Sequence, residues 1–251
     1  TLARTLDYYK VWRIMKEEKI TLAGAPAILC FRQDRSKASR KGSILFFHGL
    51  GASKETGRKE LRSLADLGYL AIAIDNIDHG ERKCFDFDFR YSPKNPKWES
   101  AFTNAVAHTA KEVPQVINEM ESRGLVKDCK IASMGISMGG YIVYRSILED
   151  RRIKGAISIL GSPRWKIESA KSPHLHPSEF YPCALLSQNA GRDESVAPKN
   201  ARNFHRSLEK YYEPAPELVE YIEFPDSGHF MEEKDWEVLW SNALKWLSCH
   251  L

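Results

Sequence analysis

Residues 131–148, IASMGISMGGYIVYRSIL, decide the fold. The apolar run from Ile131 to Met134 predicts a buried strand, and the residues from Tyr141 to Leu148 have the pattern of a helix. Between them lies Gly135-Ile136-Ser137-Met138-Gly139-Gly140, in which two glycines flank a serine at a spacing of two. Side chains at those two positions would clash with the strand and the helix if the turn is sharp. The stretch therefore predicts a strand, a strained turn and a helix, with Ser137 exposed at the carboxyl edge of a sheet.

Further strands are expected on both sides of this stretch, because short apolar runs alternate with longer segments of helical period. That alternation is typical of parallel strands joined by crossover helices. The first two runs are separated only by Gly24-Ala25-Pro26, which is too short for a crossover and predicts an antiparallel hairpin at one edge. The eight predicted strands are residues 19–23, 27–32, 43–47, 69–74, 130–135, 155–160, 184–188 and 218–224.

Helices are predicted in the gaps between the strands. Apolar spacing marks one helix that ends at Gly68 and a last helix over residues 236–247. The segment 99–123 has the same spacing but contains Pro114, so a kink or a break is expected there. Residues 1–19 mix charged and apolar side chains and predict a surface helix. With no repeat or linker in sight, residues 1–251 are interpreted as a single α/β domain.

The composition excludes several classes of protein. The 251 residues are 43% hydrophobic and 28% charged, as in an ordinary globular protein, and no apolar run is long enough to cross a bilayer. The net charge of +4 is mild, and its one basic cluster, residues 32–41, is expected to be a solvated hairpin loop rather than a nucleic-acid site. We therefore expect neither membrane nor nucleic acid as a partner.

The five cysteines lie far apart, with no C-x-x-C pair, so neither a zinc site nor a disulfide framework is predicted. The charged residues of 1–19 do not resemble the apolar core of a secretion signal. A reducing cytoplasm is the expected location.

A serine hydroxyl at such a turn becomes a nucleophile only when a base takes its proton. His229, in Asp226-Ser227-Gly228-His229-Phe230, follows the last predicted strand and precedes the last predicted helix. It is the only one of the eight histidines at the mouth of a late strand-to-helix loop. His229 is therefore the predicted general base for Ser137.

The imidazole in turn needs a carboxylate to orient it. Asp193 follows the strand over residues 184–188 and comes between Ser137 and His229 in the chain, so we expect it to be this acid. Glu194 and Asp226 are the alternatives.

A tetrahedral intermediate also needs hydrogen-bond donors aimed at its oxyanion. The segment His48-Gly49-Leu50-Gly51 directly follows the strand over residues 43–47, where a loop with such a donor is expected. The predicted donors are the backbone N–H groups of Leu50 and Met138, with a shift by one residue left open. His48 is expected to be a structural hydrogen-bonding residue rather than a second base.

Five segments occur in the order of one known group of proteins. HGLG at residues 48–51, DNIDHGER at 75–82, GISMGG at 135–140, GRDESV at 191–196 and DSGHF at 226–230 together resemble the dienelactone hydrolase-like and prolyl-oligopeptidase-like esterases of the α/β-hydrolase superfamily. The resemblance runs from about residue 20 to the C-terminus. It implies the α/β-hydrolase fold, with a mostly parallel eight-stranded sheet, helices on both faces and no large lid domain. It also implies a triad of Ser137, Asp193 and His229.

Two departures from these relatives narrow the expected activity. Dienelactone hydrolases proper have cysteine where this chain has Ser137, and prolyl oligopeptidases carry a β-propeller that this sequence does not contain. We therefore expect a serine carboxylesterase acting on small or short-acyl esters through an acyl-enzyme, without metal or cofactor. An acyl thioesterase, an amidase or a peptidase would use the same triad, and a non-catalytic binding protein on the same fold is the alternative of another class.

Two loops are expected to select the substrate. Residues 76–98 are rich in aromatic side chains, and residues 162–182 contain Arg164 and Trp165. Phe85, Arg164 and Trp165 are the candidate contacts to a small-molecule ester, while a purely structural role of the aromatic residues stays open.

Overall fold

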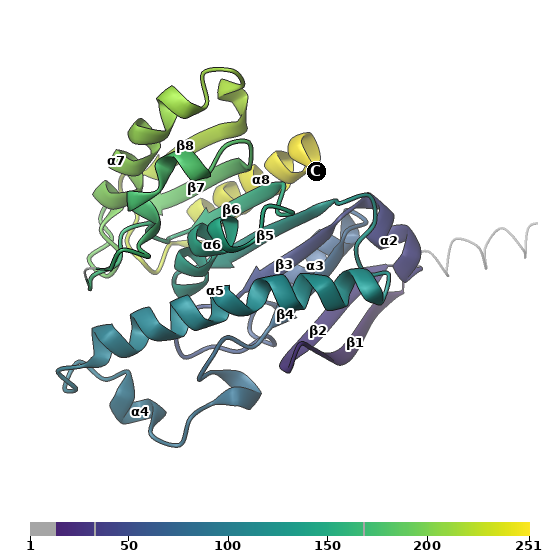
Figure 1. Ribbon diagram of the computed structural model, residues 1–251, viewed down its shortest axis with the longest axis horizontal. Helices are drawn as coiled ribbons and strands as arrows, with labels where there is room; N and C mark the ends of the chain where they lie inside the picture. Colours follow the sequence, from purple (N-terminus) through teal and green to yellow (C-terminus); the bar gives the residue numbers. More distant parts are fainter. Residues whose placement is uncertain (1–13, 33, 168) are drawn as a thin grey trace, which may run out of the picture.

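The computed structural model describes residues 14–32, 34–167 and 169–251. Its strands form one eight-stranded sheet with the order β1-β2-β4-β3-β5-β6-β7-β8 (Figure 1). The strands are β1 (Met15–Leu22), β2 (Ala25–Arg32), β3 (Ser43–Phe47), β4 (Leu70–Ile74), β5 (Ile131–Ile136), β6 (Gly155–Ile159), β7 (Ala184–Ala190) and β8 (Val219–Phe224). The eight strands therefore coincide with the predicted ones apart from their ends.

The sheet is antiparallel at one edge and parallel elsewhere. β1 and β2 form a hairpin, and β2 pairs antiparallel with β4. All pairs from β4 through β3, β5, β6 and β7 to β8 are parallel. The carboxyl ends of these parallel strands consequently lie along one edge of the sheet, where the loops that follow them meet.

Helices cover both faces of the sheet, as predicted (Figure 1). Alternate residues of β3 point to opposite faces: Leu45 packs in one hydrophobic core and Phe46 in the other. The first core is shared with α5, α6 and α7, and the second with α3 and α8. The helices are α2 (Arg35–Lys41), α3 (Arg58–Asp66), α4 (Phe87–Arg90), α5 (Trp98–Ser122), α6 (Met138–Glu149), α7 (Pro198–Leu208) and α8 (Glu233–His250).

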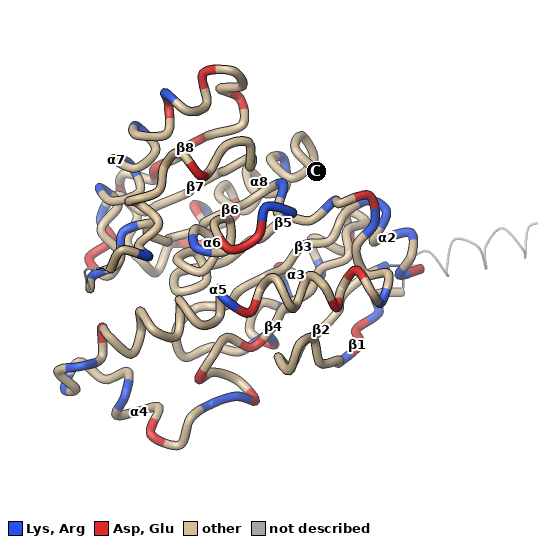
Figure 2. Tube along the Cα trace, viewed as in Figure 1, with Lys and Arg blue, Asp and Glu red and all other residues tan. Residues whose placement is uncertain are grey.

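Charged side chains avoid the centre of the sheet (Figure 2). β3 to β7 contain no Lys, Arg, Asp or Glu, because both faces of these strands are covered by helices. β1, at the edge, has the sequence MKEEKITL, and such charges discourage pairing with another chain.

The structure corrects only the last part of the surface helix that was predicted over residues 1–19. Met15 to Lys19 belong to β1, whose backbone pairs with β2, and residues 1–13 lie outside the described residues. The charged residues of β1 have a sequence pattern typical of a surface helix, but in the structure they lie on an exposed edge strand. Glu17, for example, forms ion pairs with Arg58 and Arg62 of α3 at 3.1 and 2.8 Å.

The basic cluster of residues 32–41 is not a hairpin loop, because most of it forms α2. Asp34 caps this helix by accepting a hydrogen bond from the Lys37 N–H at 3.1 Å. Ala38 and Ser39 of the helix are buried, so the segment has an inner face that its high charge conceals in the sequence.

No break interrupts α5 at Pro114, since the helix runs from Trp98 to Ser122. Val106, Val113 and Ile117 are buried on both sides of the proline, and their packing outweighs the one helical hydrogen bond that proline removes. The carbonyl of Pro114 accepts a hydrogen bond from Arg152 at 3.1 Å.

Within the described part of the chain, none of the helices has the length and apolar character needed to span a membrane. No separate lid domain lies over the carboxyl edge of the sheet in the residues that the structure describes.

Candidate active site

Ser137 lies at the sharp turn between β5 and α6. Its φ of 56° and ψ of −115° are unusual for a residue with a side chain, so this backbone is strained. A Cβ atom on Gly135 would come within 2.4 Å of the Gly139 backbone, and one on Gly139 within 2.1 Å of the Phe47 carbonyl oxygen. The two glycines are therefore required by close backbone contacts, which leave the serine projecting from the turn.

His229 lies in the loop between β8 and α8 and reaches the serine. Its Nε2 atom is 3.0 Å from Ser137 Oγ, and its Nδ1 atom is 2.7 Å from Asp193 Oδ2. Ser137 and His229 are 92 residues apart in the sequence, and the fold brings them into hydrogen-bond contact.

Asp193 is buried in the loop that follows β7. While Oδ2 faces His229, Oδ1 accepts hydrogen bonds from the backbone N–H groups of Ser195 and Val196, both at 2.8 Å. The carboxylate is thus held from both sides, and its orientation toward the imidazole is fixed.

The two alternative acids lie elsewhere. Glu194 is exposed. Asp226 forms an ion pair with Arg192 at 2.6 Å, and its side chain is 80% exposed. Of the three carboxylates considered from the sequence, Asp193 is the one that contacts His229.

The hydrogen-bonded row of Asp193, His229 and Ser137 has the arrangement needed to move a proton from the serine hydroxyl to the imidazole. When Nδ1–H donates a hydrogen bond to Asp193, Nε2 carries no proton and its lone pair is directed toward the hydroxyl of Ser137. His229 can then take the serine proton as Oγ attacks an electrophilic carbon, and Asp193 can stabilise the imidazolium that forms.

The loop after β3 lies beside the serine. A Cβ atom on Gly49 would be 3.7 Å from Ser137 Cβ, so the backbone of this loop passes close to the serine. Met138 is the first residue of α6, where an N–H group has no acceptor within the helix. Leu50 and Met138 therefore stay the predicted donors to an oxyanion.

His48 is a hydrogen-bonding residue of this loop. Its Nδ1–H donates to the Gly49 carbonyl at 2.8 Å, and its Nε2 accepts from the Asn76 N–H at 3.1 Å. Burial lowers the pKa of His48 to about 4, because a charged imidazole would lose its hydration. The ring is therefore neutral and engaged at both nitrogens, unlike that of a free base.

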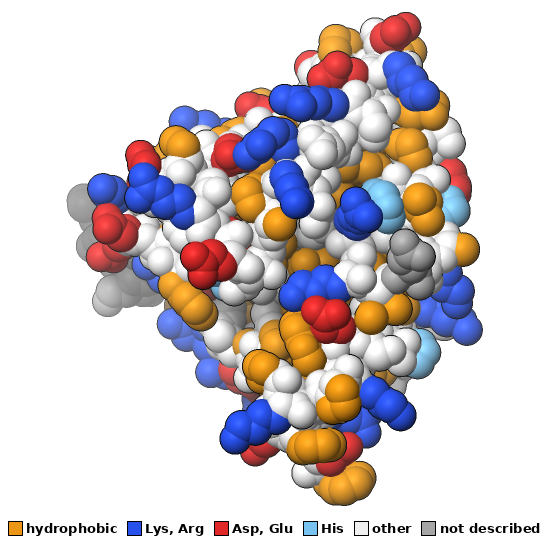
Figure 3. Space-filling view, turned by 90° about the vertical axis from the view of Figure 1, so that its left-hand side faces the viewer, with side chains coloured by type: hydrophobic (Ala, Val, Ile, Leu, Met, Phe, Trp, Pro, Cys, Tyr) orange, Lys and Arg blue, Asp and Glu red, His pale blue; other side chains and the backbone are white. Residues whose placement is uncertain are grey.

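A mostly apolar cavity of about 800 Å³ opens over Ser137 and His229. Figure 3 faces this side of the molecule, on which α5 begins, and shows hydrophobic side chains gathered around a hollow. The lining is aromatic and aliphatic for the most part, and its larger side chains are Leu50, Tyr91, Trp98, Phe102, Tyr141, Leu160, Phe230, Met231 and Trp236. Burial also raises the pKa of Tyr141 to about 12, so its hydroxyl stays protonated.

The three predicted substrate contacts do not line this cavity. Phe85 is fully exposed, at 101%, Arg164 is also exposed, and Trp165 is buried against a separate, smaller cavity. Both predicted loops do reach the cavity, but through Tyr91, Trp98 and Lys166. The reason is that a loop sequence does not reveal which of its side chains turn inward.

Sequence reasoning also missed the helical part of the cavity wall. Phe102 lies one turn after Trp98 in α5, and Tyr141 lies one turn after Ser137 in α6. The spacing of four from Ser137 to Tyr141 was a usable signal, because residues four apart share a face of a helix. One ion pair borders the cavity: Lys166 Nζ is 3.4 Å from Glu99 and 4.7 Å from the ring centroid of Trp98.

The sequence model of the dienelactone hydrolase family matches residues 31–247. The chain belongs to the dienelactone hydrolase family. It is a hydrolase of the serine hydrolase type, and its α/β-hydrolase fold is the one expected from the sequence.

Three proteins that are similar to this dienelactone hydrolase family member share little of its sequence. The Bacillus subtilis (strain 168) protein described as "Putative esterase YitV" is 21% identical over 241 residues, covering 84% of this chain and 91% of that protein. TT1662 from Thermus thermophilus has a similar structure, with a TM-score of 0.76, 21% identity and coverage of 93% of this chain and 98% of that one. The "Putative Dienelactone Hydrolase" of Klebsiella pneumoniae subsp. pneumoniae MGH 78578 is also similar in structure, with a TM-score of 0.72 and 17% identity. The match covers 94% of this chain and 98% of that one. At these identities the two structures support the fold alone.

Proposed function

We propose that this family member is a carboxylester hydrolase that acts on small or short-acyl esters through an acyl-enzyme. The observation that carries the proposal is the continuous hydrogen-bonded row from Asp193 through His229 to Ser137 beneath an apolar cavity. In this proposal Ser137 is the nucleophile, His229 the general base and then acid, and Asp193 the residue that orients and stabilises the imidazole.

The reaction has two stages. Ser137 Oγ attacks the ester carbonyl carbon while its proton passes to His229 Nε2, and the oxyanion that forms accepts hydrogen bonds from the N–H groups of Leu50 and Met138. The tetrahedral intermediate collapses, and the alcohol leaves with the proton from His229. Water then attacks the acyl-enzyme with His229 as base, and the carboxylic acid is released as Ser137 regains its proton.

The cavity supports an apolar ester as the substrate. Its volume of about 800 Å³ is within the range of small-molecule sites and has room for both the acyl group and the leaving alcohol of a small ester. Aromatic side chains such as Phe102 and Tyr141 offer flat apolar surfaces to either part. A serine at position 137, rather than a cysteine, supports ester hydrolysis over dienelactone hydrolysis.

Two measurements test the proposal. A fluorophosphonate probe followed by peptide mass spectrometry is expected to label Ser137 in the wild-type protein and nothing in Ser137→Ala. A panel of nitrophenyl esters with acyl chains from two to twelve carbons, with matched thioesters and anilides, is expected to give the highest kcat/KM on the shorter esters. Absence of labelling at Ser137 contradicts a serine mechanism, while faster turnover of thioesters or anilides reassigns the substrate class.

A further inference from the structure

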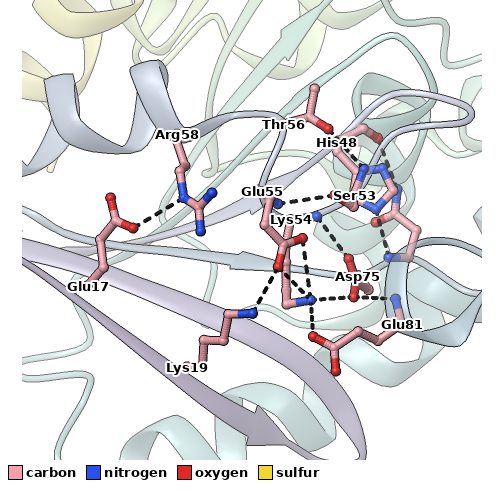
Figure 4. Close-up of polar contacts among 11 residues, drawn as sticks. Glu17, Lys19, His48, Ser53, Lys54, Glu55, Thr56, Arg58, Asp75 and Glu81 are labelled. Atoms are coloured by element: carbon pink, nitrogen blue, oxygen red, sulfur yellow. Dashed lines mark hydrogen bonds and ion pairs between the residues drawn. The ribbon is translucent and has the colours of Figure 1, made fainter.

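An ion pair lies buried at the end of the loop after β3 (Figure 4). Lys54 is 1% exposed and Asp75 is fully buried, and the Lys54 ammonium is 2.8 Å from Asp75 Oδ2. Glu81 and Glu55 approach the same ammonium at 2.7 and 3.2 Å. Burial opposes the charge on Lys54, but hydrogen bonds to these three carboxylates raise the pKa of its ammonium above the usual value. Neither Lys54 nor Asp75 contacts the cavity over Ser137.

Asp75 holds more than the ammonium. Its Oδ1 accepts the backbone N–H of Lys54 at 2.8 Å, and its Oδ2 accepts the backbone N–H of Glu81 at 2.9 Å. Gly80 passes so close that a Cβ atom there would lie 2.0 Å from Asp75 Oδ1. One buried carboxylate therefore joins the loop after β3 to the loop after β4.

Both ends of the loop after β3 are hydrogen-bonded to Asp75 and Asn76, the two residues that directly follow β4. At its start, the side chain of Asn76 donates to the His48 carbonyl at 2.9 Å, and His48 accepts the Asn76 N–H. At its end, both the backbone and the side chain of Lys54 bind Asp75. Between these ties lie residues 49–53, which include the predicted donor Leu50.

Such a tie matters for catalysis because backbone donors act on an oxyanion only when they are already fixed in place. Gly51, inside this segment, has a φ of +75°, so the loop adopts a backbone that free chains populate mainly at glycine. The loop also reaches the edge hairpin, since Glu55 pairs with Lys19 of β1 at 3.6 Å. The loop is thus anchored by residues that do not line the cavity over Ser137.

We propose that the buried Lys54–Asp75 ion pair positions the oxyanion loop, residues 49–53, for the reaction at Ser137. This inference rests on the proposed ester hydrolysis. Lys54 is a positioning residue: it acts through the backbone of its own loop and does not touch the substrate.

The test compares Lys54→Met, which keeps most of the side-chain length and removes the charge, with Arg152→Met as a matched control. Arg152 also pairs with a buried aspartate, Asp150, at 2.5 Å. It precedes β6, however, and so lies at the amino ends of the parallel strands, opposite the carboxyl ends where Ser137 lies. Both variants lose one partner of a buried carboxylate. The measurements are kcat, KM, the melting temperature and the inhibition constant of a trifluoromethyl ketone, whose tetrahedral adduct places an oxyanion against the loop.

Complete loss of one oxyanion donor lowers kcat by about 10²- to 10³-fold. A loop that is only partly misplaced in Lys54→Met is therefore expected to lower kcat by about 10- to 100-fold. KM should stay within about threefold, because the ground-state ester does not need the donor. Binding of the trifluoromethyl ketone should weaken in proportion to kcat/KM. Arg152→Met should lose thermal stability and keep its kcat.

Because Lys54→Met leaves a buried aspartate unpaired, the double variant Lys54→Met/Asp75→Asn serves if the single variant does not fold. It is also expected to show a reduced kcat with a nearly unchanged KM. The inference is overturned if either folded variant keeps wild-type kcat and inhibitor binding, or if Arg152→Met shows the same kcat loss. A wild-type protein that is not labelled at Ser137 counts instead against the proposed function, and this inference falls with it.

Discussion

Asp193 binds the His229 imidazole with one carboxylate oxygen and two backbone N–H groups with the other. The carboxylate is therefore held in place by the backbone of its own loop as well as by the histidine. Such an arrangement allows the carboxylate to hold one tautomer of the ring without moving during the reaction.

Asp193→Asn is accordingly expected to lower kcat severely, by about 10⁴-fold as in trypsin-type triads, because an amide favours the wrong imidazole tautomer. Asp226→Asn is the matched control, since it removes only an exposed ion pair with Arg192. Steady-state ester hydrolysis by the two purified variants checks the ranking. If Asp226→Asn is the impaired variant, the acid has to be reassigned.

Ser137→Ala is expected to lower ester hydrolysis by about 10⁴-fold or more and to leave the circular dichroism spectrum unchanged. The reason is that removal of Oγ deletes the proposed nucleophile but no packing contact in the core. Activity near that of the wild type, after purification from a host lacking other esterases, would show that the hydrolysis does not need this serine.

Gly139→Ala is expected to destabilise the protein by at least about 1–3 kcal/mol, since its Cβ atom would lie 2.1 Å from the Phe47 carbonyl oxygen. Gly155→Ala, in the neighbouring strand β6, meets nothing closer than 3.4 Å and is the tolerated control. Urea denaturation measures both. Equal effects would mean that the turn at Ser137 can relax.

Phe102→Ala is expected to change the relative kcat/KM of esters with different acyl lengths, because it enlarges the apolar cavity. One methylene in such a pocket is worth about 10- to 200-fold in discrimination. Phe85→Ala removes an equally large ring that is fully exposed outside the cavity, so its substrate profile should match the wild type. A shift in preference caused by Phe85→Ala alone would return the specificity to the exposed loop.

The stability is expected to fall as the pH is lowered below the histidine pKa of the unfolded chain, about 6.5. Burial lowers the pKa of His48 to about 4 and that of His205 to about 3, so between these values and 6.5 the unfolded chain binds more protons. In that window each of the two rings makes the free energy of unfolding rise by about 1.4 kcal/mol per pH unit. Above about pH 6.5 the full contribution of both rings to the stability is present. Urea denaturation from pH 4.5 to 8 should show this slope, reduced in His205→Gln; an unchanged slope in that variant would contradict the assignment.

The sequence predicts most of the fold because strand-and-helix alternation is a property of contiguous residues. The proximity of Ser137, His229 and Asp193 could be predicted as well, since the carboxyl ends of parallel strands meet at one edge. Their catalytic roles stay predictions that the experiments above address.

What could not be predicted depends on contacts between distant segments. Met15 to Lys19 have charges suited to a helix, and only their pairing with β2 makes them a strand. Likewise, Phe85 and Phe102 look alike in the sequence, but one faces solvent and the other lines the cavity. The buried state of Lys54 had no local signal, because three carboxylates from two loops create it.

The separation of 92 positions between Ser137 and His229 also sets an order of events during synthesis. At about 5–20 residues per second, the ribosome needs roughly 5–20 s to make that stretch after the serine has been added. The proposed nucleophile therefore waits without a base until β8 has taken its place at the far edge of the sheet. Hydrolysis by a nascent chain would then report the moment at which β8 docks against β7 and brings His229 to the serine.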